Sequence, residues 1–306
     1  MDNYRTRKLG VIPSPKDYRD FHVTRFVRVK AAFPREFTVA PLVPAPYDQG
    51  DVGACVAFAL KAIKEMQEQK ERGKLTHFSA AYVYAAREEK HYQGEGMVPR
   101  DALDILLKRG VCREELFPGI YPYPVAASML TDEMHQDAYP QRILAYAAIY
   151  TVEEMKAALM ELGPVLVVIP VYDSFYQGGE LPKPNTLAER MYGFHALTVV
   201  GWTPNNRWLA LNSWGQNWGT LHGYCTLPFD YPISEMWTLT DYAPDEKKNE
   251  GKFDYQLFIE PAMKGFRRNW LVHLGRFASR EEALERVAKP LQQDLAKLGK
   301  HCRVRL

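Results

Sequence analysis

The stretch YDQGDVGACVAFA, residues 47–59, decides how the first half of the chain folds. Its glycine-containing turn leads into a segment whose apolar side chains recur at helical spacing, and Gly73 supplies a stop. We therefore predict a helix within residues 53–72 that begins beside Cys55. A thiol in the first turn of a helix lies near the positive end of the helix dipole, which favours the thiolate. A buried structural cysteine is the ordinary alternative.

Two later segments, GFHALTVVGW (193–202) and LALNSWGQNWGTLHGY (209–224), contain a histidine and an asparagine. Taken singly, His195 reads as a satisfied core residue and Asn212 as a turn residue. Taken together with Cys55, they follow the chain order and spacing of one known arrangement of nucleophile, base and orienting amide. The joint pattern therefore favours catalysis over packing.

A glutamine and a tryptophan complete this candidate site. Gln49 lies six residues before Cys55, where a turn could direct its amide N–H at an oxyanion that forms when the thiol attacks. A surface turn glutamine is the ordinary alternative. The tryptophans after Asn212 offer rings that could shield an Asn212–His195 hydrogen bond from water.

Composition places the chain among ordinary globular proteins. Of its 306 residues, 46% are hydrophobic and 25% charged, which argues against a disordered tail, a fibrous repeat or a disulfide-stapled miniprotein. The apolar runs fall short of the roughly 20 residues of a membrane-spanning helix, and the first residues lack the apolar core of a secretory signal. We expect no membrane partner and a cytoplasmic location, with release by a route that needs no signal left open.

The four cysteines, Cys55, Cys112, Cys225 and Cys302, are scattered along the chain. They form no CxxC pair, and no histidines cluster with them at zinc spacing. We expect free thiols in a reducing compartment, no metal site and no cofactor.

Three parts follow from the sequence pattern. Residues 1–38 hold nine Lys and Arg against four Asp and Glu and lack helical periodicity. We expect them to form an extended arm, acting as a short pro-segment, that packs on the next part and partly covers its cleft.

Residues 39–243 place helices before short apolar strands, which favours an α+β domain with a helical lobe, a strand-rich lobe and a cleft between them. Besides the first helix, we predict helices at 80–90, 102–110 and 152–163, and strands at 164–171, 195–202, 207–214 and 223–229.

The third part, residues 252–306, follows a polar linker and reads as a small α/β module. We predict strands at 253–260, 270–277 and 301–306 and a helix at 279–299. Residues 251–306 hold 12 Lys and Arg against 6 Asp and Glu, although the whole chain carries only +2. The module resembles half of a sporulation-related repeat domain, which implies binding to peptidoglycan or another anionic cell-wall polymer. Nucleic acid is a less favoured partner, and an accessory subdomain without a ligand is the alternative.

The segments around Cys55, His195 and Asn212 resemble the papain-like cysteine peptidases, and the resemblance covers roughly residues 40–235. It implies the family's two-lobed fold and a peptide or protein substrate. It also implies roles: Cys55 as nucleophile, His195 as base and acid, Asn212 orienting the imidazole, Gln49 with the Cys55 backbone N–H as oxyanion hole, and Trp214 as a shield. The rivals are an amidase or acyl transferase with the same residues, and a binding protein whose cleft is catalytically silent.

The same resemblance implies a pocket for the second side chain upstream of the cleaved bond. Its apolar walls would be Pro99, Val168, Gly193 and Ala196, with Gly96 and Met97 offering backbone groups; packing between the lobes is the alternative role of these residues. The sequence also departs from most relatives. Val52 and Val56 stand where those have a cysteine and a tryptophan, so the family's usual disulfide cannot form, and the chain resembles bacterial members.

Overall fold

The computed structural model describes residues 4–39, 45–87, 94–119 and 126–240 in full. Of the later chain it describes the strand backbones 253–261, 270–277 and 302–305, with Glu285, Lys289 and Gln293. The chain divides into two compact units, Met1–Asp241 and Tyr242–Leu306.

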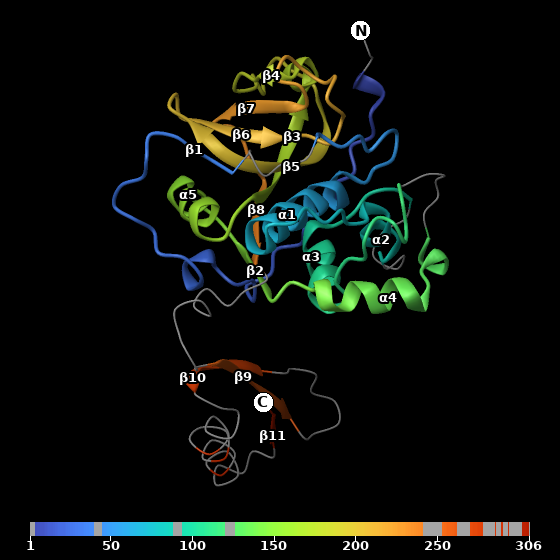
Figure 1. Cartoon of the computed structure of the whole chain (residues 1–306). Helices are drawn as coiled ribbons and strands as arrows, with labels where there is room; N and C mark the ends of the chain where they lie inside the picture. Colours follow the sequence, from blue (N-terminus) through green and yellow to red (C-terminus); the bar gives the residue numbers. More distant parts are fainter. Residues whose placement is uncertain are drawn as a thin grey trace. The chain divides into compact units, whose positions relative to one another are not determined.

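Four α-helices lie in the helical lobe of the first unit (Figure 1). They are α1 (Cys55–Arg72), α2 (Ala80–Ala85), α3 (Pro99–Lys108) and α4 (Asp132–Ala138). Local chemistry sets their ends: α1 stops at Gly73, whose φ of 68° is the left-handed conformation that glycine adopts readily, and the Ser79 hydroxyl accepts a bond from Tyr82 N at the start of α2. The helices predicted at 53–72 and 102–110 are confirmed. The one predicted at 80–90 is shorter, and residues 88–93 lie outside the described chain.

The strand-rich lobe is built on an eight-stranded sheet with the order β2-β8-β3-β5-β6-β7-β4, and β1 pairs with β5 beside this path. Neighbouring strands are antiparallel except β4 and β7. The strands are β1 (Phe37–Thr38), β2 (Ala145–Ala148), β3 (Val165–Tyr172), β4 (Gly179–Glu180), β5 (Met191–Thr203), β6 (Arg207–Leu211), β7 (Tyr224–Pro228) and β8 (Glu235–Thr240). The four predicted strands correspond to β3, β5, β6 and β7. Strand β5 begins four residues earlier than predicted.

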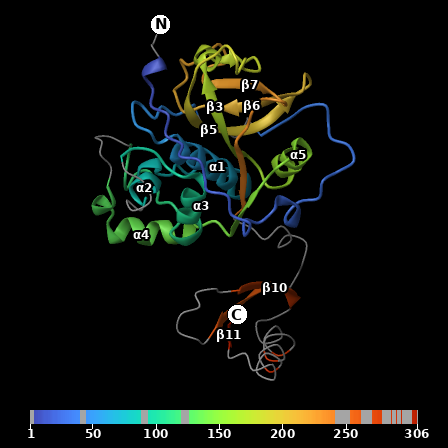
Figure 2. The same cartoon turned by 180° about the vertical axis from the view of Figure 1, so that it is seen from behind.

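Both faces of β3 are covered, which explains why all eight of its residues are buried. Leu166 and Val168 belong to the apolar cluster that contains α1, whereas Val167 and Ile169 belong to the cluster that contains α5 (Val152–Glu161). Figures 1 and 2 show α1 between the sheet and the helices α2 and α3. The continuous apolar run of β3 is therefore typical of a central strand with both faces packed.

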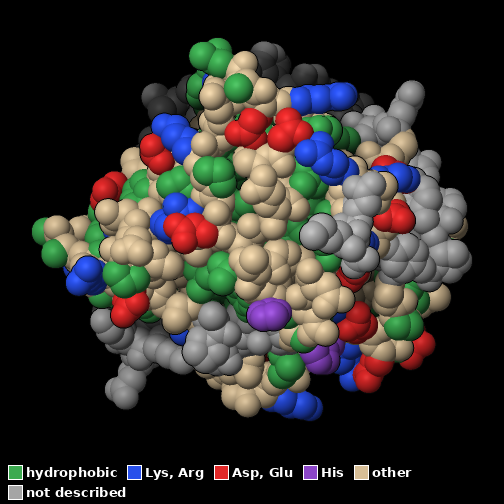
Figure 3. All heavy atoms as spheres, turned by 90° about the horizontal axis from the view of Figure 1, so that it is seen from above, with side chains coloured by type: hydrophobic (Ala, Val, Ile, Leu, Met, Phe, Trp, Pro, Cys, Tyr) green, Lys and Arg blue, Asp and Glu red, His purple; other side chains and the backbone are tan. Residues whose placement is uncertain are grey.

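Short 3₁₀ turns occur at Tyr4–Thr6, Val23–Arg25, Ala127–Met129, Tyr139–Gln141 and Asp173–Gln177. Seen from above (Figure 3), acidic and basic side chains are interspersed over the exposed face of the strand-rich lobe. Within the residues that the structure describes, no helix is long and apolar enough to cross a membrane.

The second unit contains a three-stranded antiparallel sheet with β9 (Phe253–Pro261) between β10 (Trp270–Phe277) and β11 (Cys302–Arg305). The three strands predicted for this module are therefore confirmed. The helix predicted at 279–299 lies almost wholly outside the described residues, so it stays a prediction.

Helix α1 and strand β5 are joined by a buried hydrogen bond. Thr198 Oγ1, on β5, donates to the carbonyl of Ala59 in α1 over 3.1 Å. The side chain of Thr238 on β8 is similarly buried, but its hydroxyl has no hydrogen-bond partner in the described part of the chain. The two threonines form a matched pair for measuring what the helix-to-strand bond contributes.

Replacing Thr198 with valine keeps the side-chain shape and removes this bond. We expect Thr198→Val to lower the free energy of unfolding by about 1 kcal/mol, as is usual for one internal hydrogen bond. Thr238→Val should leave stability unchanged or raise it, because it removes a buried hydroxyl that lacks a partner. Urea unfolding followed by tryptophan fluorescence measures both, and equal effects would contradict the assignment.

Candidate active site

Cys55 is the first residue of α1 and its side chain is fully buried. The turn before it is held by short backbone contacts, among them a bond from Ala54 N to the carbonyl of Val52 of 2.8 Å. The sulfur therefore lies at the N-terminal end of an 18-residue helix, as the sequence predicts. Cys112 and Cys225 are also buried free thiols, and the side chain of Cys302 lies outside the described residues.

His195 and Asn212 form the hydrogen bond that their spacing suggests. His195 Nε2 and Asn212 Oδ1 are 2.7 Å apart, and both side chains are buried. Asn212 Oδ1 also accepts a bond from Ser213 N, so the histidine must donate through Nε2. His195 Nδ1 then carries the lone pair, and this atom has no hydrogen-bond partner among the described residues. The arrangement leaves one ring nitrogen available for proton transfer.

Aromatic rings surround the imidazole. Trp214 lies with its ring centroid 4.9 Å from that of His195, and Phe175 lies at 5.7 Å. Both rings are almost completely buried. They cover the imidazole from the side of the strand-rich lobe's core, and the shielding role of Trp214 stays a prediction. The role of Phe175 was not apparent from the sequence, because it lies 20 residues from His195 in a segment without a motif.

Gln49 is buried with its amide held from both ends. Its Oε1 accepts a bond of 2.6 Å from Ser213 Oγ, and its Nε2 donates to the carbonyls of Val52 (2.8 Å) and Lys8 (3.2 Å). Ser213 thus fixes which way the amide points. The role of Ser213 was not predicted from the sequence, although its position directly after Asn212 was a usable signal.

The N-terminal arm runs through this site as an extended peptide. Val11 forms β-bridges with Phe194 on one side and Met97 on the other, and Met97 N donates to the carbonyl of Gly10 over 2.8 Å. The backbone N–H groups of Ala196 and Gly10 are directed at the sulfur of Cys55. Since the carbonyl of Lys8 accepts from Gln49, the arm contacts the residues proposed for both nucleophile and oxyanion hole.

Glycine at position 10 makes this approach possible. A side-chain carbon added at Gly10 would lie 2.0 Å from the carbonyl oxygen of Gly53, which is impossible without moving one of the two backbones. The arm is therefore fitted to the turn in front of Cys55.

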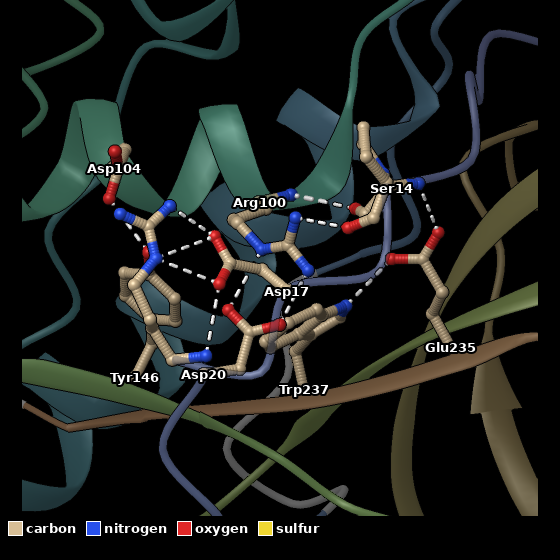
Figure 4. Close-up of polar contacts among 10 residues, drawn as sticks. Ser14, Asp17, Asp20, Arg100, Asp104, Tyr146, Glu235 and Trp237 are labelled. Carbon is tan, nitrogen blue, oxygen red and sulfur yellow. Dashed lines mark hydrogen bonds and ion pairs between the residues drawn. The ribbon is translucent and has the colours of Figure 1, made fainter.

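A polar cluster anchors the next part of the arm (Figure 4). The Arg100 guanidinium pairs with both carboxylate oxygens of Asp20, and Arg100 N donates to Ser14 Oγ over 3.2 Å. Ser14 N donates to Glu235 Oε1 over 2.6 Å. The cluster ties the arm to α3 in one lobe and to β8 in the other.

Burial determines the protonation of Cys55 and of His195. Burial raises the pKa of the Cys55 thiol to about 11, although the N–H groups of Ala196 and Gly10 act in the opposite direction. Burial also lowers the pKa of His195 to about 4, against the raising effect of the Asn212 bond. In this covered state both groups are neutral at pH 7. The thiolate expected from the helix dipole alone is not the favoured form here.

The residues predicted to form the upstream pocket lie where the arm passes. Val168 and Ala196 are paired across β3 and β5, and both belong with Met97 and Val11 to one buried apolar cluster. The side chain of Leu9 lies 3.3 Å from the position that a side chain would take at Gly193. Gly96 and Pro99 are buried in the same segment as Met97. Among the described residues, no group of three or more His, Cys, Asp or Glu could hold a metal ion.

Comparison with known proteins gives a consistent answer. A family model described as papain family cysteine protease matches residues 35–232. A peptidase C1-like protein of Acanthamoeba polyphaga mimivirus is 25% identical over 75% of this chain and 84% of its own length, and cathepsin J of Mus musculus is 26% identical over 74% and 69%. The structure is similar to that of xylellain, a cysteine protease from Xylella fastidiosa, with a TM-score of 0.68, 26% identity and coverage of 78% of this chain and 97% of that one. The family match ends before the second unit, so the cell-wall partner of residues 252–306 stays a prediction.

Adding one methyl group at Gly10 should displace the arm. We expect Gly10→Ala to raise the rate of Cys55 alkylation by iodoacetamide at pH 7 by at least about tenfold, because the thiol becomes accessible and its pKa falls toward the ordinary value. The labelled cysteine is identified by peptide mass spectrometry.

Gly201→Ala is the matched control, because its added carbon would lie 2.1 Å from the carbonyl oxygen of Phe37, away from the site. It should lower stability without selective labelling of Cys55. Equal acceleration in both variants would mean that general loosening, and not the arm, controls access.

The depressed pKa of His195 predicts how stability depends on pH. In the unfolded chain the imidazole titrates near 6.5, whereas in the folded chain it titrates near 4. Between these values the unfolded chain binds a proton that the folded chain does not, so stability falls as pH decreases from about 6.5 to 4, by up to about 3 kcal/mol. His195→Gln should lack this component. Urea unfolding of both proteins across this range checks it, and parallel pH profiles would contradict it.

Proposed function

Because the chain belongs to the papain family of cysteine proteases, we propose that it hydrolyses peptide bonds through a thioester formed on Cys55. The observation that supports this most directly is the position of the arm. An extended peptide backbone passes Gln49, Cys55 and Met97 in turn and places a carbonyl on the Gln49 amide. A substrate peptide can take the same path once the arm leaves.

The roles follow from the hydrogen bonds. Asn212 holds the proton of His195 on Nε2, so Nδ1 takes the proton of the Cys55 thiol to form an imidazolium–thiolate pair, and the thiolate then attacks the substrate carbonyl. The Gln49 amide N–H and the Cys55 backbone N–H then stabilise the negative charge on the carbonyl oxygen. His195 passes the proton to the leaving amine, which departs and leaves a thioester. It next takes a proton from water, and the resulting attack releases the carboxylic acid and restores the thiol.

Removal of the arm is required before this chemistry. In the covered state Cys55 and His195 are neutral because both side chains are buried away from water. Hydration of the open cleft removes this burial, which is the main cause of both pKa shifts. The helix N-terminus then favours the thiolate without opposition from burial. We therefore propose that the open enzyme has the imidazolium–thiolate pair and the covered enzyme does not.

A small-amide hydrolase or acyl transferase with the same residues is the competing function. The path of the arm favours a peptide, because backbone groups on both sides of Cys55, at Phe194 and at Met97, bind an extended chain. Comparing kcat/KM for internally quenched peptides with that for short amides such as acyl-anilides separates the two. Equal values for the two substrate classes would favour the rival.

Substitutions at the four residues should have graded effects on peptide hydrolysis. Cys55→Ala should abolish turnover and His195→Ala should be nearly as severe, with the double variant little worse, because the two act as one unit. Gln49→Ala should lower kcat by about 10²- to 10³-fold, the usual cost of one oxyanion donor. Asn212→Ala should have a smaller effect than His195→Ala, because Asn212 orients the ring and transfers no proton.

Cys225→Ala is the matched control, because Cys225 is an equally buried thiol in β7. It should retain turnover. Each rate is measured on the full chain and on its Gly10→Ala form, with an active-site titration to count competent enzyme. Residual turnover above about 1% in Cys55→Ala would place the nucleophile elsewhere.

A further inference from the structure

The first described residues of the arm fill a small polar site next to the catalytic residues. Arg5 donates to Asp173 Oδ1 over 2.9 Å and to the hydroxyl of Tyr192 over 2.6 Å. Its guanidinium carbon lies 5.3 Å from the ring centroid of Tyr176 and 5.7 Å from that of Tyr192. One carboxylate, one phenol and two aromatic faces therefore bind a single arginine side chain.

The acceptor groups of this site are fixed by the strand-rich lobe itself. Asp173 begins the 3₁₀ turn Asp173–Gln177, directly after β3. Its Oδ2 accepts a bond of 3.0 Å from Arg190 N, and its Oδ1 accepts one of 2.9 Å from the hydroxyl of Tyr192. These bonds, from Arg190 first and then from Tyr192, and the contact with Arg5 lower the pKa of Asp173, so the carboxylate is charged at neutral pH. The acceptor would stay in place without Arg5.

The site is continuous with the catalytic centre. The ring of Tyr176 stacks on Trp214 with centroids 5.8 Å apart, and Trp214 covers His195. Tyr4 of the arm also stacks on Trp214, at 6.1 Å. An arginine bound at Asp173 is thus separated from the imidazole by two successive rings, Tyr176 and Trp214.

The path of the arm gives the side of the cleaved bond. Residues 4–5 lie at Trp214 and Asp173, Gly10 lies at Cys55, and Ile12 N donates to the carbonyl of Met97. The resemblance noted above assigns Met97 to the upstream side of the substrate. Asp173 therefore lies on the downstream side, where the leaving amine is released.

Two further basic residues of the arm, Arg7 and Lys8, also pair with carboxylates, which supports a basic occupant. Arg7 pairs with Asp48 over 2.8 Å, and Lys8 pairs with Glu95. A cavity of about 620 Å³ is lined by Glu95, Tyr176 and Tyr192 and by residues 5 and 7–9 of the arm. Because the basic groups named here belong to the arm, their departure leaves Glu95 facing the cavity and removes the cationic partners of Asp48 and Asp173.

We propose that Asp173, Tyr176 and Tyr192 form a substrate subsite that binds an arginine side chain downstream of the cleaved bond. The subsite rests on the proposed peptidase function and adds a substrate preference to it. In the covered state Arg5 occupies this subsite, so the arm and a basic substrate compete for the same carboxylate.

Paired peptides test the subsite on the full chain. Internally quenched peptides of one sequence carry Arg, Gln or Glu in turn at each of the first four residues after the cleaved bond, which is located by mass spectrometry of the products. The readout is the ratio of kcat/KM for the Arg peptide to that for the Gln peptide. Covering by the arm affects both peptides equally and cancels in this ratio.

We expect a ratio of about five or more at one of the four positions, as for a half-exposed ion pair with aromatic contacts, and a ratio below one for Glu against Gln. Asp173→Asn should bring the Arg-to-Gln ratio close to one, and Tyr192→Phe should lower it partly. Asp20→Asn is the matched control: it weakens the arm's anchor to Arg100, away from the subsite, so it should raise both rates and keep the ratio.

Two results would overturn the subsite alone: a ratio near one at all four positions in the wild-type chain, or an unchanged preference in Asp173→Asn. Either would mean that Asp173 serves only to hold the arm. If no peptide is cleaved, even by the Gly10→Ala form, the proposed peptidase function fails and the subsite fails with it.

Discussion

The packing of α1 against β5 is the contact on which the site depends. Cys55 begins the helix and His195 lies on the strand, 140 residues later, so this packing sets where the helix N-terminus with its thiol lies relative to the strand that carries the imidazole. The Thr198–Ala59 hydrogen bond crosses the same interface, and the apolar cluster around it includes side chains from α1, β3 and β5.

Desolvation is the physical cause of the inactivity that we propose for the covered site. Burial raises the thiol pKa to about 11 from an ordinary value near 9, a shift of about 3 kcal/mol against the thiolate. A helix N-terminus typically contributes about 1 kcal/mol or less in favour of an anion. Burial therefore outweighs the dipole in the covered state, and in the proposed mechanism the balance reverses when the arm leaves and water enters. In this proposal, control of activity and control of protonation are one event.

Charge complementarity explains why this arm fits this cleft. Arg5, Arg7 and Lys8 of the arm each pair with a different carboxylate along its path. In the fourth pair the charges are reversed, because Asp20 of the arm pairs with Arg100 of α3. Most of these pairs are partly exposed, so each contributes little alone. The backbone bridges at Val11 and the close approach of Gly10 to Gly53 provide the fixed geometry that surface ion pairs lack. Arm and substrate would use the same groups.

Features encoded by neighbours in the chain could be predicted from the sequence. The Gly73 stop, the Ser79 cap and the apolar run of β3 each depend on a few adjacent residues, and the pattern around Cys55, His195 and Asn212 is specific enough to indicate both fold and chemistry. The tertiary structure alone decided which ring nitrogen of His195 is available, that Ser213 orients Gln49, and that the covered thiol is neutral. It alone brought Arg5 to Asp173. These outcomes depend on burial and on contacts between segments far apart in the chain, and desolvation has no signature in the local sequence.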